Sequence, residues 1–311
     1  MKIEIKNLVQ TFGKTRAVDD ISFDFGSGHI FGFIGPNGAG KTTTIRVMAS
    51  LDMPTAGDVL YDGISVIDEP EKVRTVMGYM PDALPEHGDI AVWEYLDFFA
   101  RAYGIQGQQR TRVLREIEDF TGLGYMRQKY LNQLSKGMKQ RVSMARALVH
   151  NPQILIMDEP AAGLDPRARI ELRELLKILA SQGKAILISS HILSELEDMC
   201  HGAVIIEKGK LLRAGTIDKI KRDDGLSFTT VLLRCCGDNG DTLKKLLEQP
   251  FINEAREASP GEYVIDIDGE DDECAELLSN LIRGGVRVAE FKRQSTGLEE
   301  LFMNVTKGEV Q

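Results

Sequence analysis

A glycine-rich stretch at residues 35–43, G-P-N-G-A-G-K-T-T, constrains this chain more than any other feature. It fits the pattern G-x-x-x-x-G-K-[ST], in which the backbone N–H groups of a loop turn inward around an anion. Residues 30–34 (I-F-G-F-I) predict a buried strand before it, and residues 42–51 predict a helix after it. A strand, a loop and a helix start in this order favour a phosphate-binding loop over an ordinary glycine-rich turn.

The residues of this stretch have expected roles in holding a nucleotide. Gly38 and Gly40 let the backbone approach phosphate groups without a Cβ in the way. Lys41 is expected to reach the β- and γ-phosphates, and the Thr42 hydroxyl is expected to ligate Mg²⁺. The full set of expected nucleotide contacts in the loop is Gly35, Pro36, Asn37, Gly38, Ala39, Gly40, Lys41, Thr42 and Thr43.

Composition limits the partners and the compartment. The 311 residues are 42% hydrophobic and 27% charged, which is typical of a soluble globular chain with one large domain or one large and one small domain. The net charge of −9 argues against a nucleic-acid partner, since phosphate backbones need clustered Lys and Arg. Cys200, Cys235, Cys236 and Cys274 form no C-x-x-C pair and suit a reducing compartment.

Nothing in the sequence predicts a targeting or membrane segment. The first residues, M-K-I-E-I-K-N, do not resemble a signal peptide. No stretch approaches 18 consecutive apolar residues, the length that spans a bilayer. Any membrane role is therefore expected to come through another polypeptide.

The order of patterns predicts a mixed sheet with crossover helices. Alternating segments before the phosphate loop predict a small antiparallel sheet, and uniformly apolar runs after it predict strands buried on both faces of a parallel sheet. Strands are expected at residues 2–9, 17–25, 54–63, 73–81, 154–157 and 185–189, and helices at residues 92–103, 110–121, 136–150 and 165–182.

The pattern changes after about residue 218. The order β-α-β-β-α-β predicts a small ferredoxin-like α+β domain, followed by a helix at 297–306. The acidic run 266–273 lacks the spacing of a Ca²⁺ loop, so a solvated loop with acids at a helix N-terminus is favoured over a metal site. The expected elements are strands at 228–235, 251–257, 262–268 and 286–293 and helices at 241–249 and 272–284.

Two acids directly follow the buried strand at 154–157. In a chain with a phosphate loop, acids at this position suit a partner for Mg²⁺ and an activator of water. Asp158 is expected to hold Mg²⁺ through water, and Glu159 is expected to be the general base for the water that attacks the γ-phosphate. Alone, D-E-P could be a simple turn; the phosphate loop upstream favours the catalytic interpretation.

His191 ends the next apolar strand, at the edge where ligands bind in open α/β sheets. It could hydrogen-bond a γ-phosphate, or it could be an ordinary surface residue. Ser135 is predicted to cap the helix at 136–150, and with Gly137 it predicts a second phosphate site at a helix N-terminus. Two phosphate sites for one nucleotide indicate that one of them acts on a neighbouring molecule.

These motifs together resemble those of the ATP-binding subunits of ATP-binding cassette (ABC) transporters, over about residues 2–217. The phosphate loop resembles the family's Walker A motif, and I-L-I-M-D-E-P resembles Walker B. L-S-K-G-M at 134–138 is similar to the signature L-S-G-G-Q, and A-G-L-D places Asp165 in the dimer-contacting D-loop. The resemblance implies that His191 corresponds to the histidine of the family that is called the switch histidine.

The resemblance also assigns residues that pattern alone would not. Phe12, which as an isolated Phe would be core, takes the place of the aromatic that stacks on adenine, with Val18 beside it. Ser135 and Gly137 are implied to touch the γ-phosphate of the opposite subunit. Two positions depart from the family pattern. Lys136 and Met138 replace the Gly and Gln of the signature, and Asp82 stands at the place of the Q-loop glutamine, where it could still approach Mg²⁺ or the water.

The resemblance implies an overall organisation. It gives a P-loop ATPase core at 1–217, with a mixed sheet, an antiparallel β subdomain and a helical subdomain at about 83–152, and an accessory α+β domain at 218–311. ATP and Mg²⁺ are the implied cofactors. Two copies would sandwich two ATP molecules head to tail and would drive a separate membrane permease from the cytoplasmic face of the cell membrane.

The subclass can be narrowed by resemblance. The single cassette, the aromatic-rich helical insert and the C-terminal T-G-L-E-E-L-F-M-N-V-T resemble the ATPases of ABC-2-type exporters. The alternatives are a soluble ABC ATPase that acts on ribosomes or DNA, and a regulatory ATP-binding module with little turnover. The first usually has two cassettes or long coiled-coil insertions, which this acidic chain lacks. Lys41, Glu159 and His191 argue against the second, while Asp82 leaves it open.

Overall fold

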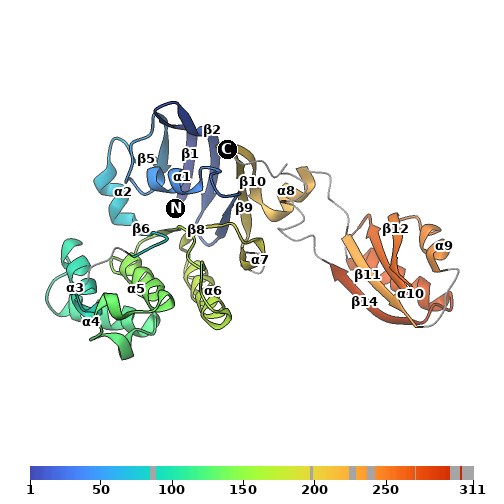
Figure 1. Ribbon diagram of the computed structural model, residues 1–311. Helices are drawn as coiled ribbons and strands as arrows, with labels where there is room; N and C mark the ends of the chain where they lie inside the picture. The colour runs from blue at the N-terminus through green and yellow to red at the C-terminus, as the bar shows by residue number, and fades with distance from the viewer. Residues whose placement is uncertain are drawn as a thin grey trace. The chain divides into compact units, whose positions relative to one another are not determined.

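The computed structural model divides the chain into two compact units, Met1–Ile217 and a second that begins at Asp218 (Figure 1). The bounds of the helical subdomain and the role of residues 218–311 as an accessory domain stay predictions. The structure describes residues 1–84, 89–196, 199–223, 229–236, 242–269, 271–294 and 302.

A six-stranded mixed sheet forms the centre of the first unit, in the order β10-β9-β3-β8-β7-β6 (Figure 1). Five strands run parallel, and β10 pairs antiparallel with β9. Every residue of β3, β7, β8 and β9 is buried, which explains their almost continuously apolar sequences. The strands are β3 Ile30–Ile34, β6 Met77–Met80, β7 Ile154–Met157, β8 Ala185–Ser190, β9 Gly202–Glu207 and β10 Lys210–Thr216.

A second, antiparallel sheet has the order β2-β1-β4-β5. Buried and more exposed residues alternate along β1 and β2, as expected for strands with one face on the core. Its strands are β1 Lys2–Phe12, β2 Thr15–Gly26, β4 Ala56–Tyr61 and β5 Ile64–Ser65.

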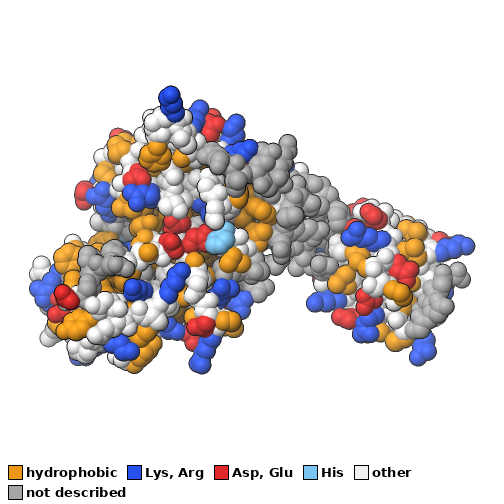
Figure 2. All heavy atoms as spheres, in the orientation of Figure 1, with side chains coloured by type: hydrophobic (Ala, Val, Ile, Leu, Met, Phe, Trp, Pro, Cys, Tyr) orange, Lys and Arg blue, Asp and Glu red, His pale blue; other side chains and the backbone are white. Residues whose placement is uncertain are grey.

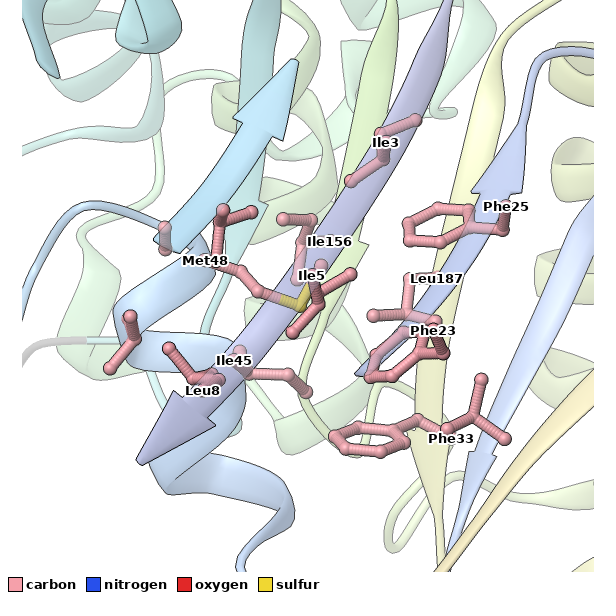
Figure 3. Packing of buried hydrophobic residues seen from close by; sticks show 14 of the residues in the cluster. Ile3, Ile5, Leu8, Phe23, Phe25, Phe33, Ile45, Met48, Ile156 and Leu187 are labelled. Atoms are coloured by element: carbon pink, nitrogen blue, oxygen red, sulfur yellow. The ribbon is translucent and has the colours of Figure 1, made fainter. Parts of the chain in front are cut away.

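One hydrophobic core joins the two sheets and α1 (Lys41–Met48). Side chains of β1, β2 and α1 meet residues of β3, β7 and β8 in this core, among them Ile5, Phe33, Ile156 and Leu187 (Figure 3). Because β3, β7 and β8 are parallel and fixed in this core, the loops after their carboxyl ends lie at one edge of the sheet.

Helices between β6 and β7 form a second core of their own. The apolar residues of α3, α4 and α5 pack together there, with Val92, Leu96, Leu123, Met126 and Val142 fully buried. The helices are α3 Val92–Ala102, α4 Gly107–Phe120 and α5 Lys136–Leu148, with 3₁₀ turns at Gly124–Met126 and Leu131–Gln133. Further along the unit lie α6 Pro166–Ser181 and α7 Leu193–Leu196, and α8 Ile217–Asp223 spans the boundary with the second unit. None of the helices within the described ranges is long and apolar enough to cross a membrane.

Two local predictions were wrong. Residues 73–81 were expected to be a strand, but α2 occupies Pro70–Val76 and only Met77–Met80 is extended. Pro70 is the first helical residue, where its fixed φ favours a helix start and its missing N–H costs nothing. The helix after the phosphate loop ends at Met48 rather than near Leu51, since Ser50 has φ +55°.

The second unit has the chain order β11-α9-β12-β13-α10-β14 and an antiparallel sheet in the order β12-β13-β11-β14. This is the order of a ferredoxin-like fold, as expected. The two helices and the sheet share a small core that includes Val231, Ile265 and Leu277. The elements are β11 Thr229–Cys235, α9 Thr242–Leu247, β12 Ile252–Ser259, β13 Glu262–Ile267, α10 Asp271–Arg283 and β14 Val288–Gln294. The helix expected at 297–306 lies outside the described residues, apart from Phe302.

Candidate functional site

The loop between β3 and α1 adopts a conformation that requires its glycines. Gly38 and Gly40 have φ of +81° and +100°. A residue with a Cβ would be strained at such positive φ angles, whereas glycine adopts them readily. A Cβ on Gly40 would lie 2.5 Å from the carbonyl oxygen of Ala17, and one on Gly35 would lie 2.4 Å from that of Ile206. Neighbouring strands therefore press against both ends of the loop, which fixes its backbone at the N-terminus of α1.

Lys41 begins α1 and points back along the loop. Its side chain is buried, with 6% exposure, and its Nζ donates hydrogen bonds to the carbonyl oxygens of Gly35 and Pro36 at 2.7 and 3.2 Å. Burial lowers the pKa of Lys41, while the carboxylates of Glu159 and Asp158 act in the opposite direction. The ammonium group thus lies against the loop, where its positive charge can bind a phosphate group.

Glu159 lies between two other predicted site residues. Its Oε1 is 3.9 Å from Lys41 Nζ, and its Oε2 is 2.9 Å from Nδ1 of His191. Glu159 has φ +48°, a left-handed conformation that is uncommon for a residue with a side chain, directly after β7 and Asp158. The structure therefore brings Lys41, Glu159 and His191 together, although more than 30 positions separate each of them from the next in the sequence.

Ser189 ties the two acids to the end of β8. Its hydroxyl donates to Oδ1 of Asp158 at 2.6 Å and accepts from the backbone N–H of Glu159 at 2.9 Å. Asp158 is 2% exposed and lies behind Glu159. Sequence reasoning missed Ser189. The available signal was a serine at the second-to-last position of an apolar strand that a site histidine directly follows.

Removal of this hydroxyl is expected to destabilise the protein. Ser189→Ala should lower the free energy of unfolding by about 1–3 kcal/mol, because a buried carboxylate and a backbone N–H both lose their partner. Ser143→Ala is the matched control, since the Ser143 hydroxyl is buried and has no hydrogen-bond partner among the described residues. Denaturant unfolding of both variants measures the difference. Equal losses for the two variants would contradict the bridging role of Ser189.

A cavity of about 440 Å³ opens in front of these residues. In Figure 2, carboxylate and histidine side chains lie side by side in the middle of this face of the first unit, above α5 and α6 as Figure 1 places them. The cavity is lined by Ala17, Asn37, Gly38, Gly40, Lys41, Thr42, Thr43, Asp82, Lys136, Glu159, Ala162 and His191.

Asp82 lines the cavity, as expected for a residue near the reacting phosphate. Its backbone carbonyl accepts a hydrogen bond from Nε2 of Gln140 at 3.2 Å. Gln140 belongs to α5, so this bond links the segment after β6 to the helical core. Gln140 therefore connects α5 to a residue that lines the cavity.

The two residues expected at the adenine do not line the cavity. Phe12 is 53% exposed at the end of β1, and Val18 is 1% exposed in the core. The neighbouring Ala17 lines the cavity at this side. Stacking of Phe12 on adenine stays a prediction; the side chain of Val18 has almost no accessible surface to offer a ligand.

The other expected phosphate contacts lie outside the cavity. Ser135 caps α5 by accepting from the N–H of Met138 at 3.3 Å, and Asp165 caps α6 by accepting from Ala168 at 3.0 Å. Gly137, in the first turn of α5, has only Leu164 near the position of a Cβ, at 3.5 Å. These residues do not complete the nucleotide site of their own copy. This placement is compatible with the expected contact to a second copy, which stays a prediction.

The donor atoms in the cavity fit Mg²⁺ in combination with a nucleotide. The Thr42 hydroxyl and the Asp82 carboxylate, which line the cavity, are hard oxygen ligands of the kind Mg²⁺ prefers, whereas Asp158 is buried and is not among the lining residues. Within the described ranges, no group of three His, Cys, Asp or Glu side chains is arranged to hold a metal by itself. Phosphate oxygens and water would have to complete the coordination, as is usual for Mg²⁺ in nucleotide sites.

Comparison with known proteins identifies the class that this fold and cavity define. Residues 18–162 match the family model described as ABC transporter. The uncharacterised ABC transporter ATP-binding protein YhcH of Bacillus subtilis is 34% identical over 99% of this chain and 98% of its own. Nod factor export ATP-binding protein I of Cupriavidus metallidurans is 32% identical over 99% and 98%.

A solved structure supports the same class. The ATP-binding cassette MJ0796, in a dimeric post-hydrolysis state bound to ADP and Pi, is similar with a TM-score of 0.64 and 25% identity, over 69% of this chain and 98% of its own. This chain belongs to the ATP-binding proteins of ABC transporters. It is thus an ATPase built on the P-loop ABC fold.

Proposed function

We propose that this chain powers a separate membrane permease by hydrolysing ATP as a dimer, in an exporter. The observation that carries the proposal is the contact of Glu159 with both Lys41 and His191 at the mouth of the phosphate loop. A base, a phosphate-binding cation and a hydrogen-bonding imidazole at one point are the groups that γ-phosphate transfer to water requires. The similarity of this chain to its relatives, one of which is named for Nod factor export, supports export as the direction of transport.

In the proposed reaction, the loop N–H groups and Lys41 hold the phosphates of ATP. Glu159 accepts the proton of the attacking water, and His191, on the far side of the same carboxylate, hydrogen-bonds the γ-phosphate and keeps Glu159 oriented. Thr42 would hold Mg²⁺ directly and Asp158 would hold it through water; the bound ion would supply positive charge beside the phosphate oxygens. Ser135 and Gly137 would come from the second copy, so the nucleotide joins the two copies.

A second groove, which shares no lining residue with the cavity, suits the permease. Its volume is about 180 Å³, and it lies between the end of α1, β6 and the helices α3 and α5. Arg146 lies 5.4 Å above the ring of Phe99, and His150 stacks on Tyr103 at 3.8 Å between ring centres. Leu51, which also lines the groove, is 51% exposed.

The charge of the groove comes from arginine. Burial lowers the pKa of His150 to about 4, so its imidazole is neutral near pH 7. Arg74, which is paired with Glu71 at 2.9 Å, and Arg146 bring guanidinium groups to the groove. The groove would therefore accept a short cytoplasmic segment of the permease that carries apolar side chains and an acid. Of the helices that form the groove, α5 also carries Gln140, whose amide donates to the carbonyl of Asp82.

Purification from native membranes tests the proposal. A tagged copy solubilised with detergent should bring down a protein with several apolar spans. Leu51→Asp should lose this partner because a carboxylate replaces an exposed apolar contact, while Ile178→Asp, a matched aliphatic residue of similar exposure on α6, should keep it. Recovery of ribosomes or DNA instead of a membrane protein would contradict the transporter function. Equal recovery by both variants would contradict the groove as the docking site.

A further inference from the structure

The carboxylate of Glu159 is carried by a backbone in an unfavourable conformation. At φ +48°, a residue with a Cβ is strained. Most of the other residues with a side chain that share this φ region in the described ranges are Asn or Asp, whose short polar side chains tolerate it. Such strain persists only where neighbouring groups hold the backbone. The position of the Glu159 carboxylate therefore depends on the hydrogen bonds of its main chain.

Two hydrogen bonds hold the main chain of Glu159. Its N–H donates to the Ser189 hydroxyl at 2.9 Å, and its carbonyl oxygen accepts from the N–H of Ala162 at 3.1 Å. The bond to Ala162 closes a local turn within one segment. The bond to Ser189 reaches a strand 30 positions away in the sequence, so it ties Glu159 to the central sheet.

The Ser189 hydroxyl is itself fixed in one orientation. A hydroxyl has a single proton, and Ser189 donates it to Oδ1 of Asp158 at 2.6 Å. An oxygen lone pair is thereby left for the N–H of Glu159. Ser189 is fully buried, so water does not compete for either bond. The bonds run in one direction, from the Glu159 N–H through the hydroxyl to a carboxylate, and the charge at the end strengthens both.

Asp158, at the end of this chain of bonds, is firmly anchored. Its N–H donates to the carbonyl oxygen of Met80 at 2.8 Å, so it is held to the end of β6 as well as to Ser189 on β8. Ser189 thus transmits the rigidity of three neighbouring strands to Glu159. The carboxylate that depends on this support is the one that contacts Nδ1 of His191 at 2.9 Å.

We propose that Ser189 is a positioning residue for ATP hydrolysis, whose hydroxyl holds the backbone of Glu159 in the conformation that presents the general base to the nucleotide cavity. The proposal rests on the proposed role of Glu159 as that base. Ser189 is absent from the cavity lining, so it acts through Glu159 and not on the nucleotide. Loss of the hydroxyl leaves the phosphate loop and Lys41 in place. The rate of hydrolysis should therefore fall while the affinity for ATP stays.

Steady-state hydrolysis and calorimetric binding of a non-hydrolysable ATP analogue to the full chain test the proposal. Ser189→Ala should lower kcat about 10- to 100-fold, the effect of a base misplaced by about 1 Å, and should bind the analogue within about twofold of the wild-type affinity. A crystal structure of the variant should show Glu159 with negative φ and its carboxylate away from His191. Ser143→Ala removes a buried hydroxyl with no partner in the described ranges, and it should match the wild type in kcat and affinity.

A double variant separates positioning of the base from a general loss of structure. In Glu159→Gln the base is already absent, so the further change Ser189→Ala should lower the residual rate by no more than about twofold. A residue that only supported the fold would lower the rate by the same factor in both backgrounds. Ser189→Cys replaces Ser189→Ala if that variant does not fold. It nearly keeps the volume, but its thiol is a weak donor, so kcat should again fall with affinity retained.

Three results would overturn the proposal. They are a wild-type kcat in the folded Ser189 variants, a loss of analogue affinity as large as the loss of kcat, and an equal effect of Ser189→Ala with and without the Glu159 carboxylate. Failure of the proposed function gives a different pattern. Near wild-type turnover of Glu159→Gln removes the base itself. A slow Glu159→Gln beside a fully active Ser189→Ala leaves the base in place and removes only the role of Ser189.

Discussion

Glu159→Gln is expected to bind ATP almost as well as the wild type and to hydrolyse it about 10²–10⁴ times more slowly. The amide keeps the size of the side chain and can still contact His191, but it cannot accept the proton of the attacking water. Binding is retained because the phosphates are held by the loop and Lys41, which the substitution leaves in place. With hydrolysis blocked, ATP should also hold the two copies together, so the variant should elute as a dimer when ATP is present.

Steady-state phosphate release, calorimetry and size-exclusion chromatography measure these three properties. Glu254→Gln is the control, because Glu254 is exposed on β12 in the second unit and should behave as the wild type. If Glu159→Gln hydrolyses ATP within a factor of a few of the wild-type rate, Glu159 is not the general base. Loss of ATP binding would instead mean that the carboxylate mainly positions Lys41.

Lys41→Ala is expected to weaken ATP binding about 10- to 100-fold, the effect of losing a hydrogen bond to a charged group, and to lower hydrolysis to background. The variant should remain folded, since it removes a charge whose burial is unfavourable and leaves a small apolar residue at the start of α1. Unfolding measurements check this point.

Lys184→Ala is a matched control for the buried lysine. Lys184 is also partly buried, donates to Asn151 and to the carbonyl of Pro152, and has a pKa lowered by burial, but it lies outside the cavity lining. It should bind and hydrolyse ATP as the wild type does. Comparable losses of ATP binding in both variants would mean that Lys41→Ala acts by disturbing the fold and not by removing a contact with the phosphates.

Sequence alone was sufficient where local chemistry dictates structure. The phosphate loop was predictable because positive φ at Gly38 and Gly40 and close backbone contacts at Gly35 and Gly40 leave few alternatives. The strands β7 and β8 were predictable because burial on both faces demands continuous apolar runs. The caps of α5 and α6 followed from Ser135 and Asp165 for the same local reason.

Sequence was insufficient where tertiary contacts decide. The apolar pattern at 73–81 fits a strand, but Pro70 starts a helix and only the last residues pair with β7. Ala17 reaches the cavity and Val18 does not, because alternation along β2 directs Val18 into the core. The role of Ser189 depends on Asp158, a neighbour from a distant segment of the chain that no spacing rule brings to it.

We propose that the cavity of one copy is half of an active site, which a second copy completes. The most direct test mixes two inactive variants, Lys41→Ala and Gly137→Asp, the second of which places a carboxylate where the other copy's phosphate should lie. Each alone should show background ATPase activity. After mixing and exchange, activity should return to about a quarter of the wild-type rate, since half of the dimers pair unlike copies and each of these has one intact site. Full activity of Gly137→Asp by itself, or no recovery on mixing of copies that exchange, would contradict the claim.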